Sequence, residues 1–190
     1  SRPFFSSVFC TEYASEVGLN CTSTASALVA PAAARPFTPN DMVSLDRVSS
    51  PTVSPDGKWI VFGRQENGNM DIWRMRADGT GQRPISRGGG LYTAPNWSPR
   101  GDLIAFTKQG GGQFSTGVMN SDGSGERILS SSYFEEGPSW APNGRYIMFA
   151  RQSPGGDTRL WTVDLSGRVV SQAGYSGRGT DPAWSPLLDE

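Results

Sequence analysis

The chain has 190 residues and a formal net charge of −1, from 17 basic and 18 acidic residues that are interspersed. This balance argues against binding to nucleic acid or an anionic membrane, because both require a basic patch, and no stretch reaches the roughly 20 apolar residues of a membrane span. Histidine is absent, which excludes Ser-His-Asp and Cys-His catalytic sites and histidine-containing zinc sites. We expect no catalytic residue, no metal and no cofactor.

Residues 1–35 form an irregular leader that differs from the rest of the chain. Its segment 25–34 is apolar and rich in small residues, like the core and cleavage zone of a secretory signal. This composition hints at export. Cys10 and Cys21 both lie in the leader, and they are either two ordinary thiols or one local disulfide of an exported protein.

Residues 36–50 lead from the leader into a repetitive region. Thr38 can cap a helix that begins at Pro39, because proline is favoured at the first helical position. The sequence therefore predicts a short helix within residues 36–48. Residues 51–190 are expected to form the folded domain.

A short motif recurs through this domain, with the pattern proline, any residue, tryptophan or valine, serine or alanine, proline, any residue, glycine, and one further residue. It spans 51–58, 95–102 and 138–145, and an incomplete copy spans 182–186. The second prolines of successive copies are separated by 44, 43 and 44 residues. A fixed period of this size indicates a repeat architecture.

Each full repeat contains four strand-sized segments joined by glycine turns. The first turn carries Gly57, Gly101 or Gly144, and it is typical of a two-residue hairpin that needs a positive φ. The second segment is a continuous apolar run, such as 103–106, which predicts a strand covered on both faces. A second glycine turn follows the third segment.

Four antiparallel strands per 43–44 residues are typical of a β-propeller blade. We predict an all-β propeller with three four-stranded blades at about 51–86, 95–130 and 138–171. The incomplete copy at 182–186 would be an orphan innermost strand. Tryptophans recur in two columns of the repeat, and we interpret them as packing between blades: Trp97, Trp140 and Trp184 in one, Trp73 and Trp161 in the other.

Residues 85–188 resemble the last blades of the TolB family, the periplasmic propeller of the Tol–Pal envelope system. The matching pieces run from Tyr92 to Thr107, from Glu136 to Gly144, and over the Asp-Pro-Ala-Trp-Ser-Pro-Leu-Leu sequence at 181–188. The resemblance implies a TolB-type propeller, a periplasmic or secreted location, and a Pal-like peptidoglycan-associated lipoprotein as partner.

A second resemblance covers residues 37–57. This segment is similar to the start of the propeller in secreted prolyl-oligopeptidase-type peptidases. Those enzymes carry their catalytic triad on a separate hydrolase domain, which this chain does not contain.

Three blades leave the propeller open, since propellers usually have between four and eight. We consider three ways in which the ring could close. In the first, the chain is a fragment or blend of larger proteins and closes within an assembly. In the second, two copies form a six-bladed ring, and in the third, the leader completes a fourth blade. Self-association is thus one of three alternatives.

Three classes of function fit the sequence. The first is a non-enzymatic, protein-binding propeller of the bacterial cell envelope, as the TolB resemblance implies. The second is an accessory propeller domain or fragment of a serine peptidase that lacks its hydrolase domain. The third is an independent carboxylate-dependent enzyme, although no pair of carboxylates stands out for that role.

A partner is expected to bind where the repeats vary. The loops between second and third strands and the connections between blades share one rim of a propeller, and they differ from repeat to repeat. Such freedom favours recognition, and aromatic residues are frequent anchors of interfaces. The partner-binding residues predicted on this basis are Tyr92, Tyr133, Phe134, Glu135, Glu136 and Tyr175. The alternative is that the aromatic residues among them fill gaps between the blades.

Overall fold

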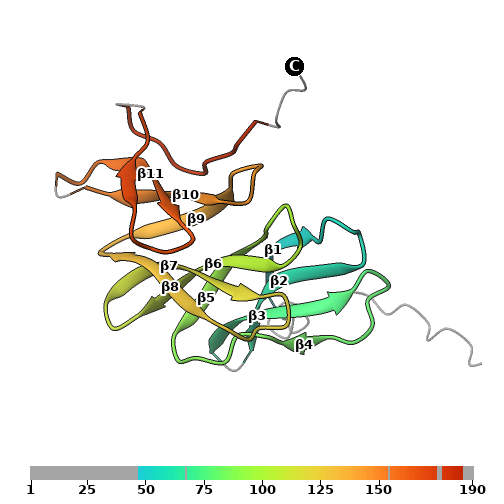
Figure 1. Cartoon of the computed structure of the whole chain (residues 1–190). Helices are drawn as coiled ribbons and strands as arrows, with labels where there is room; N and C mark the ends of the chain where they lie inside the picture. The colour runs from blue at the N-terminus through green and yellow to red at the C-terminus, as the bar shows by residue number, and fades with distance from the viewer. Residues whose placement is uncertain (1–46, 67, 154, 175–176, 186–190) are drawn as a thin grey trace, which may run out of the picture. The chain divides into compact units, whose positions relative to one another are not determined.

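The computed structural model describes residues 47–66, 68–153, 155–174 and 177–185. These residues all belong to a single unit, Asn40–Glu190 (Figure 1). The leader and the helix predicted near Thr38 lie outside the described residues, apart from residues 47 and 48, which are part of a strand.

The described residues form three four-stranded antiparallel sheets and hold no helix. Blade 1 consists of β1 (Arg47–Val53), β2 (Trp59–Glu66), β3 (Asn69–Arg76) and β4 (Arg83–Pro84). Blade 2 consists of β5 (Leu91–Trp97), β6 (Leu103–Gly110), β7 (Gln113–Asn120) and β8 (Arg127–Ser132). Blade 3 consists of β9 (Glu135–Trp140), β10 (Tyr146–Gln152), β11 (Thr158–Asp164) and β12 (Val170–Gln172). The strands of each sheet lie in sequence order, so the predicted all-β propeller fold is confirmed.

The innermost strand of each blade begins earlier than the repeated proline suggests. β1, β5 and β9 each contain a bulge at that proline, where the pairing with the second strand shifts register. The residue before the proline has a positive φ: 48° at Ser50, 49° at Ala94 and 65° at Gly137. Proline cannot donate to the ladder, and a bulge removes that need without ending the strand. The blade boundary predicted at residue 51 therefore lies inside β1.

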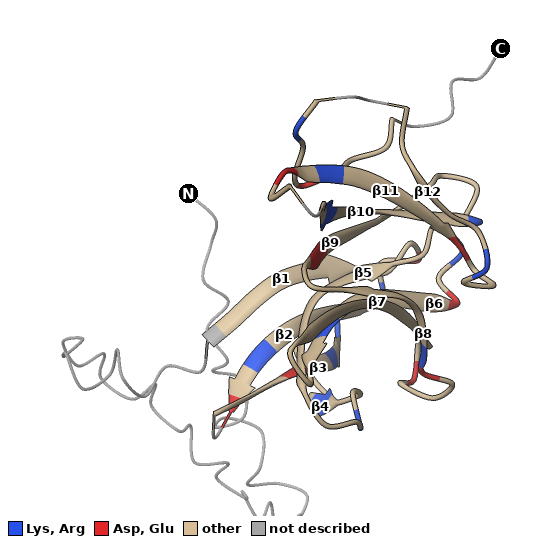
Figure 2. Cartoon of the chain, turned by 90° about the vertical axis from the view of Figure 1, so that its left-hand side faces the viewer, with Lys and Arg blue, Asp and Glu red and all other residues tan. Residues whose placement is uncertain are grey.

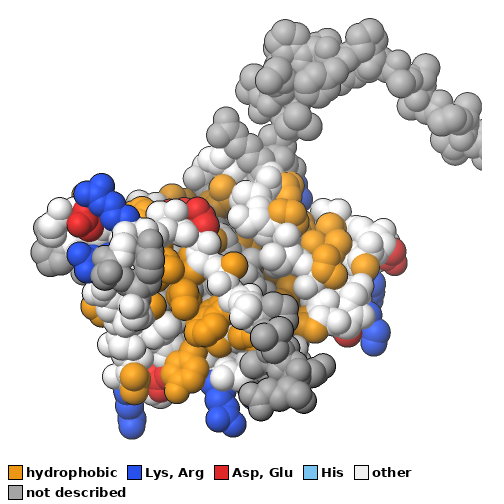
Figure 3. All heavy atoms as spheres, turned by 90° about the horizontal axis from the view of Figure 1, so that it is seen from above, with side chains coloured by type: hydrophobic (Ala, Val, Ile, Leu, Met, Phe, Trp, Pro, Cys, Tyr) orange, Lys and Arg blue, Asp and Glu red, His pale blue; other side chains and the backbone are white. Residues whose placement is uncertain are grey.

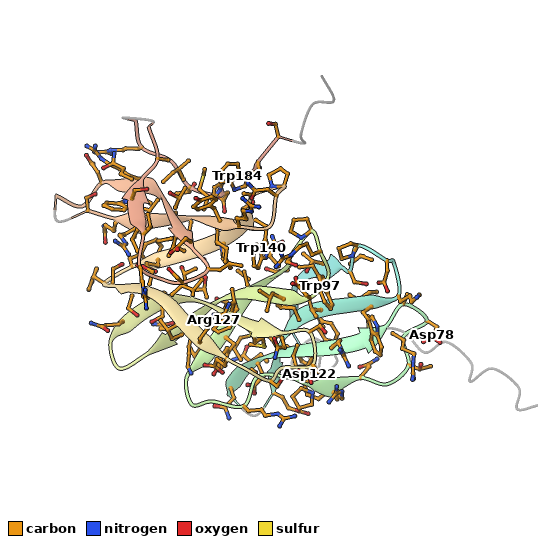
Figure 4. All side chains as sticks on the ribbon, viewed as in Figure 1. Asp78, Trp97, Asp122, Arg127, Trp140 and Trp184 are labelled. Carbon is orange, nitrogen blue, oxygen red and sulfur yellow. The ribbon has the colours of Figure 1, made fainter. Side chains whose placement is uncertain are left out.

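The segment predicted as an orphan strand keeps part of the innermost-strand geometry. Residues 182–185 form no strand in the structure, but Asp181 has the same positive φ, 50°, before its proline. Trp184 Nε1 donates to Ser139 O over 3.2 Å, as Trp140 Nε1 donates to Asn96 O over 3.0 Å. Figure 4 shows the tryptophans following one another from blade to blade. The segment follows the course of an innermost strand, and none of the described strands pairs with it.

The first glycine turn differs in length from the expected hairpin. Gly57 N–H donates to Ser54 O over 2.8 Å, and Ser54 N–H donates to Trp59 O. This is a four-residue turn with one left-handed residue, Gly57 at φ 70°. The positive φ is confirmed, and the two-residue loop is wrong because the Ser-Pro pair occupies the first half of the turn.

Blades 2 and 3 each pack their front face on the back face of the blade before them. We call front the face that carries Trp97 in blade 2 and Trp140 in blade 3. One core joins the front of blade 2 to the back of blade 1: Tyr92, Trp97, Ile104, Phe106 and Met119 with Val61, Ile72 and Ile85. A second joins blades 3 and 2: Trp140, Ile147, Phe149 and Val163 with Leu103, Ala105, Val118 and Leu129. Trp97 and Trp140 thus lie between blades, as predicted, and Trp161 packs against the second core, whereas Trp73 and Trp184 belong to neither core.

The middle blade is covered on both faces. All residues from Leu103 to Thr107 in β6 are buried, whereas the matching parts of β2 and β10 are partly accessible. The prediction of a strand covered on both sides therefore holds fully only for blade 2, which has a neighbour on each side.

Part of the front face of blade 1 is exposed. Val53 is 59% accessible, although the equivalent Trp97 and Trp140 are each only 7% accessible, and Val48 is 57% accessible where the equivalent Tyr92 and Glu135 are fully buried. Each of the three closures expected from the sequence would place further strands against this face. The closing partner stays a prediction.

The second glycine turn of blade 2 gives a stability prediction. A Cβ at Gly123, which has φ 89°, would lie 2.1 Å from the Ile85 carbonyl oxygen of blade 1. Gly79 has a similar φ of 84°, but no described atom within 4 Å of its Cβ position. Gly79→Ala should lower the free energy of unfolding by about 1 kcal/mol, the cost of the left-handed conformation. Gly123→Ala should lower it by about 4 kcal/mol, because the two blades must also separate.

Urea denaturation of both variants and the parent chain measures the difference. Equal losses for the two substitutions would show that the blades do not approach each other at Gly123.

Candidate functional site

A groove of about 580 Å³ opens on the rim where the blades are connected. Its walls are the connection between β8 and β9 and the loop between β10 and β11. The lining residues are Ser132, Tyr133, Arg151, Gln152, Ser153, Gly156 and Trp161. The predicted rim residues Tyr133 and Phe134 belong to one of these walls.

Phe134 anchors the connection that carries Tyr133. The Phe134 ring lies 5.2 Å from the ring of Phe114 on β7, and Gln152 N–H donates to Phe134 O over 3.1 Å. Ser132 Oγ donates to the same carbonyl over 3.0 Å. Tyr133, between these anchored residues, is 78% exposed. The chain therefore holds a large aromatic side chain in solvent at the edge of the groove.

A buried ion pair lies beneath the connection. Glu135 is fully buried, and its Oε1 accepts from Arg151 Nη2 over 2.6 Å and from Arg151 Nε over 2.9 Å. Ser130 Oγ donates to Glu135 Oε1 over 2.8 Å, and Thr116 N–H donates to Oε2 over 3.2 Å. Ser130 and Thr116 belong to blade 2, so the carboxylate joins two blades. A buried charge needs such partners, because an unpaired one is strongly unfavourable.

Arg151 and Trp161 are groove residues that the sequence analysis missed. The Arg151 guanidinium lies 4.8 Å from the centre of the Trp161 ring. The same arrangement recurs in blade 1, where Arg64 lies 4.4 Å from the Trp73 ring. The sequence did contain a signal for Arg151, because a basic residue recurs at this position in every repeat. The corresponding residue of blade 2 is Lys108.

Tyr92 lies in the core between blades 1 and 2, away from this groove. It is fully buried, and its hydroxyl donates to the Glu126 carboxylate over 2.8 Å. Burial, together with the hydrogen bond to Glu126, raises the pKa of Tyr92. Burial alone would lower the pKa of Lys108, but its bonds to Glu126 and Tyr92 outweigh that effect and raise it.

The predicted partner-binding residues therefore separate into groups. Tyr92 and Glu135 have no accessible surface, so in this structure they hold the blades together and offer nothing to a partner. Tyr133, Phe134 and Glu136 lie at the rim with accessible surface, and partner binding stays a prediction for them. Tyr175 lies outside the described residues.

Charges of both signs are spread over the three sheets (Figure 2), and the face shown in Figure 3 carries apolar side chains among polar ones. Within the described ranges, no three acidic or cysteine side chains come together as metal ligands would. The same ranges contain no helix long and apolar enough to span a membrane.

Three blades that stack front to back define the chain as a β-propeller of the repeat type. The family model of the TolB beta propeller domain matches residues 42–188. The chain belongs to this family.

Two curated relatives match shorter stretches. The Tol-Pal system protein TolB of Jannaschia sp. strain CCS1 is 53% identical over 62 residues, which are 32% of this chain and 14% of that protein. An uncharacterised protein of Agrobacterium fabrum is 45% identical over 40 residues, or 21% of this chain and 14% of that protein. The matches thus cover about a seventh of each relative's length.

Solved structures support the fold. TolB from Acinetobacter baumannii has a TM-score of 0.51 at 20% identity, covering 73% of this chain and 46% of that chain. The putative TolB from Agrobacterium tumefaciens has a TM-score of 0.53 at 20% identity, covering 69% and 63%. A prolyl endopeptidase structure has a TM-score of 0.54 at 12% identity, covering 74% and 23%. The propeller expected from both resemblances is therefore shared by both groups.

Removal of the buried carboxylate tests how the groove is supported. Glu135→Ala should lower the free energy of unfolding by about 3 kcal/mol, because Arg151 and Ser130 lose their partner in a buried place. Glu136→Ala changes the exposed neighbour and should stay within about 0.5 kcal/mol of the parent chain. Thermal or urea unfolding compares the two. Similar stabilities for both variants would show that the ion pair does not hold the connection.

Proposed function

We propose that this chain is a non-enzymatic, protein-binding propeller of the bacterial cell envelope, and that it binds a Pal-like lipoprotein. Membership of the TolB propeller family supports the class of function. The match to a Tol-Pal system protein supports the choice of system. A periplasmic or secreted location is part of the same proposal.

The observation that carries the proposal is the exposed Tyr133 beside a supported groove. Interfaces derive much of their affinity from a few aromatic or arginine side chains that become buried on binding. Tyr133 is 78% exposed, and its neighbours are held by the Phe114 contact and by the ion pair below. Such an anchor needs little ordering when a partner binds, which preserves affinity.

A second candidate function is an accessory propeller of a prolyl-oligopeptidase-type serine peptidase. The fold similarity to a prolyl endopeptidase structure supports it. Catalysis would then require a hydrolase domain outside these 190 residues, because they contain no histidine to activate a serine. In that case Tyr133 would face a hydrolase domain.

Binding to a purified, lipid-free Pal from Jannaschia sp. tests the leading proposal. The parent chain should bind immobilised Pal, and Tyr133→Ala should weaken the affinity about 30-fold, as for a hot-spot residue worth about 2 kcal/mol. Tyr146→Ala is the matched control, because Tyr146 is an exposed tyrosine of the same blade at the start of β10, next to the glycine turn. It should leave the affinity unchanged.

Failure of the folded parent chain to bind Pal would contradict the leading proposal. Specific binding to a purified hydrolase domain of the peptidase family, with no binding to Pal, would favour the second candidate. Equal weakening by both tyrosine variants would remove the groove from the site.

A further inference from the structure

A second pocket lies on the opposite rim, between the glycine turns of blades 1 and 2. It measures about 230 Å³ and is lined by Ser54, Pro55, Asp56, Trp59, Arg74, Trp97, Arg100, Gly101 and Ser121. Asp56 and Arg100 are exposed, so the pocket has access to solvent. Trp97 is 7% accessible and marks its buried side (Figure 4).

The corresponding positions at the next blade interface are apolar. At the corresponding places of blades 2 and 3, the side chains are Leu103, Val118 and Leu165, and they pack in the apolar core. In the first interface the same repeat positions hold Trp59, Arg74 and Ser121. Repeat geometry alone therefore does not require these polar residues, since aliphatic ones fill the same space elsewhere.

Two buried donors at this pocket lack an acceptor among the described residues. They are Trp97 Nε1 and Arg74 Nε. The equivalent tryptophan of the next blade, Trp140, donates to a backbone carbonyl, that of Asn96. At the first interface, Thr52 of β1 corresponds to Asn96. There the hydrogen bond between the two innermost strands is made by Thr52 Oγ1, which donates to Pro95 O over 3.2 Å. Buried donors without partners are rare and call for an explanation.

Arg74 is held in place but has no ion-pair partner among the described residues. Its guanidinium lies 4.1 Å from the centre of the Trp59 ring, and its Nη1 donates to Ser121 O over 2.6 Å. Burial, and then the charge of Arg83, lowers the pKa of Arg74, and the charge of Asp122 opposes this shift without forming an ion pair with Arg74. An anion beside this cation would offset the cost of its burial.

Asp56, the acidic residue at the opening of the pocket, already accepts hydrogen bonds from its own turn. Asp56 accepts hydrogen bonds from Ser54 Oγ over 2.6 Å and from Lys58 N–H over 3.1 Å. These bonds lower the pKa of Asp56, so it stays ionised near neutral pH. Its charge makes the pocket unsuited to a doubly charged phosphate, whereas a singly charged, planar carboxylate matches one guanidinium and one indole N–H.

We propose that the pocket between the turns of blades 1 and 2 binds a carboxylate group, with Arg74 and Trp97 as donors. This site is separate from the Tyr133 groove and does not rest on the proposed function. The carboxylate is either a small free acid or an acidic side chain of a peptide, and both present the same two oxygens.

The indole N–H resonance of Trp97 in a ¹⁵N-labelled chain reports directly on the site. Trp97→Phe assigns it among the six tryptophans. Sodium acetate, titrated against sodium chloride at equal ionic strength, should give a saturable downfield shift. A capped Gly-Glu-Gly peptide should give the same shift, with the capped Gly-Gln-Gly peptide inactive. Tighter binding of the glutamate peptide than of acetate would indicate a peptide source, and tighter binding of acetate a small acid.

Arg74→Val places at this position the residue type that blade 2 has at 118, and it should weaken acetate binding at least tenfold. Arg127→Val is the control, because it removes the same charge from β8 outside the pocket lining, and it should leave binding unchanged. A Trp97 resonance that does not respond to acetate overturns the proposal, even if the Arg74 variant fails to fold. An equal response in parent chain and Arg74→Val also overturns it.

Discussion

The structure depends on the packing of each blade's front face against the back face of the preceding blade. A single four-stranded sheet cannot bury its apolar faces alone, so every blade needs a neighbour. The aromatic and aliphatic columns headed by Trp97 and Trp140 supply this contact twice. Where no described neighbour exists, Val53 at the position of these tryptophans is exposed.

This constraint separates the two rims of the propeller. On the turn rim, Gly123 and Gly167 approach the carbonyls of Ile85 and Leu129, so successive blades touch through backbone and tolerate little change. On the other rim, contacts of Phe134 and Glu135 anchor the connection, whereas the exposed residue Tyr133 is free to differ from repeat to repeat. The first blade interface is an exception on the turn rim, since Arg74 replaces an aliphatic contact there.

Much of the fold could be predicted because the repeat is written in the sequence. The repeat period, the glycine turns and the apolar runs indicated the blades. Each of these features can be read from a short stretch of sequence, because turns require glycine and buried strands require apolar side chains. The bulges at Ser50 and Ala94 could not be foreseen, because proline in isolation marks a strand boundary and only pairing across the sheet shows that the strand continues.

The candidate site was less predictable, because burial is a property of several blades together. Tyr92 and Glu135 occupy the same repeat position and were expected at the surface, but both are enclosed by the neighbouring blade. Tyr133 and Phe134 lie beside the loop after β10, at the rim from which the prediction started, and partner binding stays a prediction for both. Arg151 was missed because its role depends on Glu135 and Trp161, which only the fold brings together.

Amide hydrogen exchange tests most directly whether packing between blades, and not hydrogen bonding within them, sets local stability. β2 and β6 are each paired on both edges within their own sheets, so their backbone hydrogen bonding is equivalent. Only β6 is covered on both faces over Leu103–Thr107. The account predicts that the β6 amides exchange at least tenfold more slowly than those of residues 60–63 in β2, since slow exchange follows burial in a cooperative core. Equal or slower exchange in β2 would contradict it.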